Sequence, residues 1–247
     1  LKRCPNISFM VELFIMIFKQ LFEKESSTYT YLLSCQEKKE TLLIDPVMET
    51  FERDLKVLHQ LKLNLTHVLE THIHADHITS ASKLREFTNC KIGGPKEDNL
   101  NCRDFHISHD DLFEVGKIKI RSIFTPGHTD AHYSYMLQSD NNNFVFSGDS
   151  LMIGSCGRTD FQSGSNDKMF NTIKNFFYKL DDHSVIFPAH DYNNVNRTTI
   201  HYSKNNNHII RENTSLQDFK DSMNNLGLDE PKKMHIAIPL NMKCGKD

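Results

Sequence analysis

Apolar residues recur along this chain with two alternating spacings. Runs rich in β-branched, aromatic and aliphatic residues at positions 28–33 and 41–44 are typical of strands. Apolar residues between Phe51 and Leu61 then recur at helical spacing, and a short buried strand is expected at 66–70. The first part of the chain therefore predicts two strands, a helix and a third strand.

The same alternation continues to the end of the chain. Helical spacing predicts helices at 77–87 and 169–180, and a further helix around Phe219 that faces the core. Strands are expected at 118–124, 132–137, 144–147 and 185–187, with a closing strand at 234–240. Because strands interleaved with helices form sheets that helices cover, the pattern predicts an α/β fold.

The length and composition favour one globular domain. The regular pattern begins near Ile17, so residues 16–247 are expected to form this domain and residues 1–15 an extension that does not contribute to the core. Apolar residues make up 38% of the chain and charged residues 25%, which fits a globular protein rather than a disordered or membrane protein. A net charge of −3 provides no basic field for nucleic acid. Neither a nucleic acid nor a membrane is therefore expected as a partner.

The six cysteines are scattered along the chain. They form no Cys-x-x-Cys pair and lack the density of a disulfide scaffold. This distribution indicates a reducing compartment. Cys156 is more simply explained as a small buried residue than as a reactive thiol.

The strongest chemical signal is the heptapeptide 71–77, Thr-His-Ile-His-Ala-Asp-His. It follows the strand at 66–70, so His72 and His74 leave the strand end on one side, and Asp76 and His77 open the next helix. Imidazole and carboxylate ligands suit zinc or iron, whereas calcium and magnesium prefer oxygen-rich loops. The alternative is a polar turn in which Asp76 caps the helix.

Three later strand ends supply possible partners for this heptapeptide. His128 follows Pro-Gly, Asp149 follows Gly, and His190 follows Pro-Ala, each directly after a predicted strand. A single histidine or aspartate at such a place is more commonly a polar turn residue. Three of them downstream of a His-x-His-x-Asp-His segment instead predict a metal site.

Several segments together resemble one protein family. The segments 71–79, 125–130, 148–151, 156–162 and 188–192 are similar to those of the metallo-β-lactamase superfamily and, within it, of persulfide dioxygenases. The resemblance extends from about Ile17 almost to the end of the chain. It implies a four-layer αβ/βα sandwich with a metal in a cleft at the edge of the two sheets.

The resemblance also implies a cofactor and a reaction. One Fe(II) would be bound by His72, His128 and Asp149, with the opposite face open to dioxygen and a persulfide sulfur. Glutathione persulfide would be oxidised to sulfite, with release of glutathione. The family further implies the mitochondrial matrix, with the cytoplasm as the alternative, and a homodimer is possible.

Four other residues have two interpretations. His74, Asp76, His77 and His190 complete a second metal position in dinuclear members of the superfamily, so the residues alone indicate two zinc ions. The resemblance to persulfide dioxygenases implies one iron instead, with these four residues orienting its ligands through hydrogen bonds.

Two residues are candidates for contact with the substrate. Tyr192 is placed to reach the open coordination positions, although a core tyrosine with a satisfied hydroxyl is the alternative. The Arg158 guanidinium could bind a glutathione carboxylate through two parallel hydrogen bonds. Its alternative is an internal ion pair with Asp160 or Asp191.

Two other functions remain open. A glyoxalase II-like hydrolase of glutathione thioesters would use the same fold and a dinuclear centre, but that family adds a helical domain after its last histidine, for which the stretch after His190 is short. A scaffold without catalysis is the second alternative. Against the scaffold, every ligand position is filled.

Overall fold

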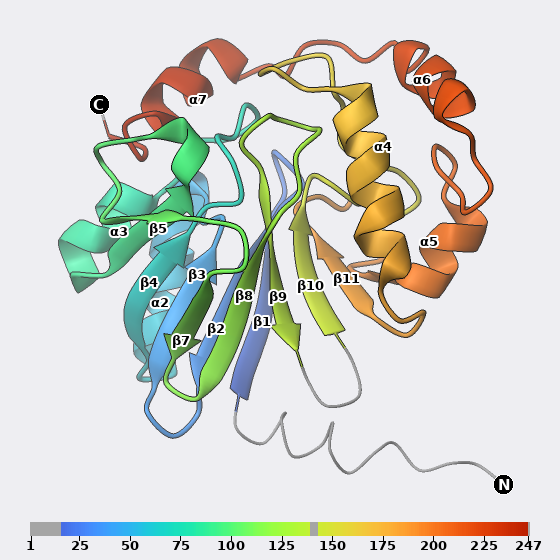
Figure 1. Ribbon diagram of the computed structural model, residues 1–247. Helices are drawn as coiled ribbons and strands as arrows, with labels where there is room; N and C mark the ends of the chain where they lie inside the picture. Colours follow the sequence, from blue (N-terminus) through green and yellow to red (C-terminus); the bar gives the residue numbers. More distant parts are fainter. Residues whose placement is uncertain (1–15, 139–142, 247) are drawn as a thin grey trace, which may run out of the picture.

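Two six-stranded sheets form the centre of the molecule (Figure 1). The computed structural model describes residues 16–138 and 143–246. The first sheet has the order β1 (Met16–Glu23), β2 (Thr28–Cys35), β3 (Glu40–Ile44), β4 (Asn64–Leu69), β5 (Lys91–Pro95) and β6 (Phe105–Ile107). The second has the order β12 (Thr198–Thr199), β11 (Val185–Pro188), β10 (Asn143–Gly148), β9 (Tyr133–Gln138), β8 (Ile118–Phe124) and β7 (Leu112–Val115).

Each sheet is mixed. The strands from β1 to β3 are antiparallel neighbours, whereas β3 to β6 run parallel. In the second sheet only β10 and β11 are parallel. Helices α2 (Phe51–Gln60), α3 (Ala81–Thr88) and α4 (Asn166–Asn175) lie in the crossover connections of three parallel pairs, and a loop with a 3-10 turn joins β5 to β6.

Helices cover the outer face of each sheet, so the molecule has four layers. Helices α2 and α3 pack on the first sheet, and α4, α5 (Ile200–Asn206) and α6 (Leu216–Asn224) on the second. Short 3-10 turns lie at Met48–Thr50, Lys96–Asp98 and Phe177–Lys179. Helix α7 (Met234–Asn241) crosses the upper edge in Figure 1. The expected αβ/βα sandwich is confirmed.

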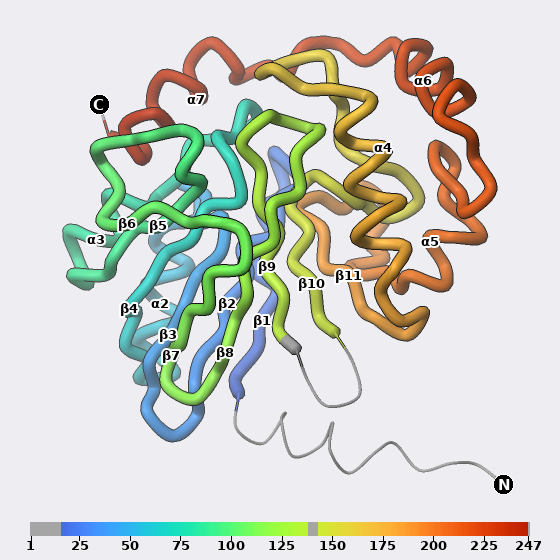
Figure 2. The backbone as a smooth tube through the Cα atoms, viewed as in Figure 1, coloured from blue at the N-terminus to red at the C-terminus, as the bar shows by residue number. Residues whose placement is uncertain are grey.

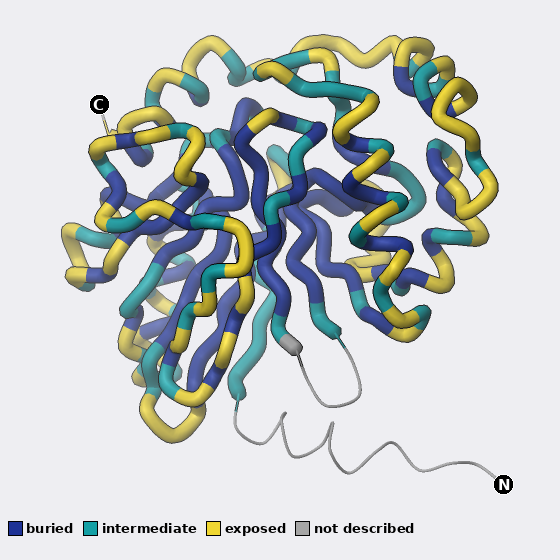
Figure 3. The backbone as a smooth tube through the Cα atoms, viewed as in Figure 1, coloured by how far each residue is buried: buried dark blue, intermediate teal, exposed yellow. Residues whose placement is uncertain are grey.

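Successive side chains of a strand point to opposite faces of its sheet, so they enter different layers of the core. On β2, Tyr31 and Leu33 face the other sheet, while Leu32 between them packs against the helices. Burying an aliphatic or aromatic side chain of this size contributes about 1.5–3 kcal/mol. In Figure 3 the central strands such as β2 and β3 are buried along their length, whereas the helices carry many exposed residues.

The expected helix at 77–87 begins later, at Ala81. The backbone before it bonds to the segment after β3 instead of forming helical hydrogen bonds: Met48 N donates to Ile78 O, and Ser80 N donates to Pro46 O. Residues 71–79, which we call the histidine loop, are therefore irregular. The predicted helix at 169–180 is also shorter, because α4 ends at Asn175 and a 3-10 turn follows.

The expected closing strand at 234–240 is wrong, because this segment is helix α7. Its alternating isoleucines suggested a strand, yet Ile236 is 61% exposed, and the buried positions are Ala237 and Asn241, four residues apart. Helical spacing therefore decides which side chains face the protein.

Cys102 and Cys244 form a disulfide, which the expectation drawn from the scattered cysteines did not include. The two cysteines are 142 residues apart in sequence, so no local spacing pattern could reveal the pair. The fold brings the turn after α7 against the loop before β6.

Two expectations concern the ends of the chain and membranes. The extension at residues 1–15 lies outside the described residues. In the described ranges, no helix is both long and apolar enough to cross a membrane.

Candidate metal centre

The candidate ligands come from loops that follow strands of both sheets. The histidine loop follows β4, His128 follows β8, Asp149 follows β10 and His190 follows β11. Figure 2 shows these loops along one edge of the two sheets. The fold therefore brings together residues that are far apart in sequence.

The hydrogen bonds of His72 decide which of its nitrogen atoms is free. The Thr71 hydroxyl donates its one proton to Asp45 Oδ2, at 2.9 Å, so it can only accept from His72 Nδ1, also at 2.9 Å. Nδ1 therefore carries the proton. His72 Nε2 is left as a lone-pair nitrogen, buried and without a hydrogen-bond partner.

His128 is oriented in the same way. Its Nδ1 lies 2.7 Å from the backbone carbonyl oxygen of Arg158 and donates to it. Its Nε2 faces Asp149 Oδ2 at 3.3 Å. Gly157 permits this arrangement, because an added Cβ there would lie 2.3 Å from Asp149 O and 3.0 Å from His128 Nδ1.

These three side chains fit a metal ion. Donor atoms of His72, His128 and Asp149 all lie within 4.8 Å of one another. His72 Nε2 is buried without a hydrogen-bond partner, a costly state that a bound cation would relieve, and the only group near Asp149 Oδ1 among the described residues is His190 Nε2 at 3.5 Å. Burial and the neighbouring histidines lower the pKa of His72 well below its ordinary value, so the ring is neutral, as a ligand must be.

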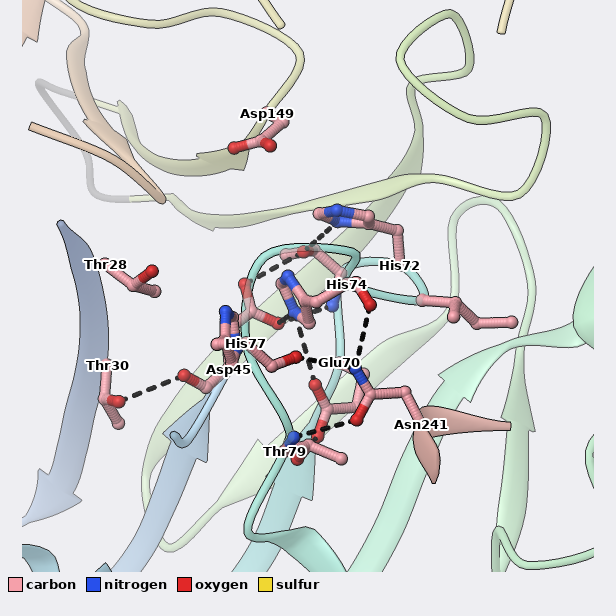
Figure 4. A network of polar contacts seen from close by, with 12 residues as sticks. Thr28, Thr30, Asp45, Glu70, His72, His74, His77, Thr79, Asp149 and Asn241 are labelled. Carbon is pink, nitrogen blue, oxygen red and sulfur yellow. Dashed lines mark hydrogen bonds and ion pairs between the residues drawn. The ribbon is translucent and has the colours of Figure 1, made fainter. Parts of the chain in front are cut away.

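His74 belongs to a second group of donor atoms. Its Nε2 lies 3.1 Å from Asp45 Oδ1 and 3.5 Å from Glu70 Oε2 (Figure 4). Burial opposes protonation, but the two carboxylates outweigh it and raise the pKa of His74 well above its ordinary value. The carboxylates hold the Nε2 proton and leave His74 Nδ1, which is buried without a hydrogen-bond partner, available to a metal ion.

Asp76 and His77 lie beside His74, and His190 lies between Asp76 and Asp149. His77 Nδ1 is 3.0 Å from Asp76 Oδ2, and His190 Nε2 is 3.6 Å from Asp76 Oδ2 and 3.5 Å from Asp149 Oδ1. Burial lowers the pKa of His190, but Asp149 and Asp76 outweigh it and raise the value to about 9. The donor atoms of His74, Asp76 and His77 also lie within 4.8 Å of one another. Geometry alone thus leaves room for a second ion.

One buried histidine at this site has no counterpart in the sequence-based prediction. His132 Nε2 accepts from the backbone N–H of Asp149 at 3.1 Å, and its ring stacks on His72 with centroids 4.9 Å apart. Burial lowers the pKa of His132 to about 3, so it supports the site as a neutral ring. His132 is the first residue of the strand predicted at 132–137, and no metal-ligand spacing marks it in the sequence.

Tyr192 and Arg158 differ in their surroundings. Tyr192 is 68% exposed and its ring lies parallel to that of His190, with centroids 5.9 Å apart, so the core-tyrosine alternative is wrong. Arg158 forms the internal ion pair with Asp160, through Nε at 2.7 Å and Nη2 at 2.8 Å. Its Nη1 and Nη2 also donate to the carbonyl oxygens of Asp229 and Leu228.

Comparison with known proteins identifies the family. Residues 24–190 match the metallo-beta-lactamase superfamily. The mitochondrial persulfide dioxygenase ETHE1 of Mus musculus is 36% identical over 231 residues, which cover 93% of this chain and 89% of that protein. The chain belongs to the persulfide dioxygenase family. The crystal structure of ETHE1 from Myxococcus xanthus, 39% identical, superposes on it with a TM-score of 0.87 and covers 93% of this chain and 100% of that one.

A thioester hydrolase is a more distant relative than these persulfide dioxygenases. A probable hydroxyacylglutathione hydrolase of Schizosaccharomyces pombe is 31% identical over 176 residues, which cover 68% of this chain and 65% of that protein. Both its identity and its coverage are lower than those of the ETHE1 relatives. The comparisons therefore favour the dioxygenase over the hydrolase.

Proposed function

We propose that this chain is an iron-dependent persulfide dioxygenase that converts glutathione persulfide and dioxygen to sulfite and glutathione. One observation carries the proposal: in a member of this family, the donor atoms of His72, His128 and Asp149 converge, and the buried Nε2 of His72 has no protein partner. Atom balance requires one dioxygen and one water for each persulfide oxidised.

The three converging side chains are the proposed iron ligands. His72, His128 and Asp149 would hold a ferrous ion, and that ion would supply the redox chemistry that dioxygen and a soft sulfur require. Thr71 and the Arg158 carbonyl fix the two rings, so both present Nε2 toward Asp149. The protein thus orients both histidine rings without a metal ion.

The remaining four residues are proposed to support this centre. Protonated His74 pairs with Asp45, the same carboxylate that holds Thr71 against His72. His190 donates Nδ1–H to Ser26 O and pairs with Asp149 through Nε2. Fixed charges around a ligand preserve its orientation without occupying the metal.

Substrate contacts are proposed for two residues. Exposed Tyr192 beside His190 can contact a molecule that enters the site.

The Arg158 guanidinium has five N–H groups, of which four are engaged in hydrogen bonds. A glutathione carboxylate can therefore bind Arg158 only if it replaces Asp160. A mitochondrial location is proposed because the curated ETHE1 relatives are named as mitochondrial.

The dinuclear hydrolase is the competing function, and metal content separates the two. Protein purified without added metal should contain about one iron per chain, the number that a facial triad binds. It should form sulfite from glutathione persulfide in air and none under argon. Two zinc ions per chain, with sulfite absent in both gases, would contradict the proposal.

A further inference from the structure

The C-terminal helix ends in a buried asparagine that contacts the histidine loop. Asn241 is the last residue of α7 and is 5% exposed. Its Nδ2 donates to the carbonyl oxygens of His74 and His77, at 2.9 and 2.8 Å, and its Oδ1 accepts from Thr79 N at 2.9 Å. Figure 4 shows Asn241 beside this loop, among the residues of the candidate site.

These bonds satisfy backbone groups that lie outside helices and strands. The described residues provide no other hydrogen bond to the carbonyls of His74 and His77. A loop with such groups unpaired and buried would rearrange to satisfy them. Because the amide offers two donors and one acceptor, one side chain fixes both ends of the segment 74–79.

The segment after Asn241 packs against the end of the histidine loop and the first turn of α3 through independent contacts. Ser82 N donates to Cys244 O at 3.0 Å, and Cys244 is linked to Cys102. An added Cβ at Gly245 would lie 1.9 Å from Thr79 O, so the backbone packs directly against the loop. These contacts hold the chain just after Asn241 next to the loop that Asn241 binds.

We propose that Asn241 is a positioning residue for the metal centre. By holding the backbone of residues 74–79, it keeps His74 on Asp45 and Glu70 and keeps Asp76 and His77 toward His190. The histidine loop then presents His72 to a metal ion without rearrangement. The inference rests on the proposed function, because it assumes that the site binds a metal.

The test compares metal affinity with folding. Asn241→Ala removes all three hydrogen bonds, and Asn241→Asp keeps an acceptor for Thr79 while replacing the amide donors by an oxygen that faces two carbonyls. Two control variants are Asn206→Ala, at the exposed end of α5, and Ile236→Ala, on the outer side of α7. Co(II) affinity is measured against a chromophoric chelator, together with the visible spectrum of bound Co(II) and the thermal melt.

Positioning predicts a specific result. Both Asn241 variants should bind Co(II) about 10–100-fold more weakly, with an altered spectrum, while the two controls match the unmodified protein. A purely structural role would lower Tm but leave the affinity and spectrum of the folded protein unchanged, which would overturn the proposal. If Asn241→Ala does not fold, the Co(II) affinity and spectrum of Asn241→Asp decide. If neither Asn241 variant folds while both controls do, Asn241 serves folding and the proposal is overturned. Failure of the unmodified protein to bind any metal would instead overturn the proposed function.

Discussion

His128 Nδ1 lies 2.7 Å from the backbone carbonyl oxygen of Arg158, and this contact directs the other nitrogen of the ring toward Asp149. The acceptor belongs to the main chain, so the contact does not depend on which side chain occupies position 158. The Cys-Gly-Arg segment therefore has two separable parts: a backbone that orients a proposed ligand and a guanidinium that pairs with Asp160.

Removing a ligand should have a larger effect than removing a supporting residue. His128→Ala should abolish iron binding, since it leaves two protein ligands. His190→Ala should keep most of the iron, with a loss of about 10–100-fold in affinity or activity. Metal analysis of purified proteins measures both, with exposed His201→Ala as the control. If His128→Ala and His190→Ala lose iron to the same extent, the dinuclear assignment is favoured instead.

The Arg158 guanidinium can be tested by comparing both members of its ion pair. If a substrate carboxylate replaces Asp160, Arg158→Gln should raise KM roughly tenfold, since a charge-assisted pair contributes about 1.5 kcal/mol. Asp160→Asn should lower KM, because it removes a competing carboxylate. Steady-state kinetics and thermal melts of both variants are required. A lowered Tm with unchanged KM in both variants would assign the pair to structure alone.

The disulfide should stabilise the fold as a whole. It joins residues 142 apart, so it restricts the unfolded chain strongly, and its loss should cost about 2–4 kcal/mol. Cys102→Ser should therefore unfold at a lower denaturant concentration than the oxidised protein. Adding reductant should shift the oxidised protein to the same midpoint and leave Cys102→Ser unchanged. Coincident unfolding curves for the oxidised protein and the variant would contradict this expectation.

The metal-free protein should depend on pH through His190. Its pKa is raised from 6.5 to about 9, because Asp149 and Asp76 outweigh burial. The stabilisation is therefore fully present below the unfolded value of 6.5 and is lost as pH rises through about 9. Thermal melts should show a decline over this range that is smaller in His190→Asn. If Tm falls with pH equally in the unmodified protein and in His190→Asn, His190 is not the source of the decline.

Much of the fold followed from local pattern. Tyr31, Leu33 and Leu32 on β2 alternate between the two core layers as strand periodicity requires. The strand predicted at 234–240 is wrong, because alternating isoleucines occur there in a helix. Only the packing shows that Ala237 and Asn241 are the inward positions. Tertiary contacts outweighed local pattern there.

The candidate site was predictable as a set of residues but not as a network. The spacing in the heptapeptide and the turns before His128, Asp149 and His190 mark the donors, which the fold brings together. The partners that orient them are ordinary residues in distant segments, such as Asp45, Asn241 and the Arg158 carbonyl. No local motif encodes such contacts, because they arise only when separate loops meet.

Oxygen uptake tests the central claim most directly. Ferrous protein prepared without air is added to glutathione persulfide in an oxygen electrode, and zinc-loaded protein serves as the control. We expect roughly one dioxygen consumed per persulfide by the iron form and none by the zinc form, because zinc has no redox chemistry. Rapid hydrolysis of S-lactoylglutathione by the zinc form, with no oxygen uptake by the iron form, would contradict the dioxygenase and establish the hydrolase.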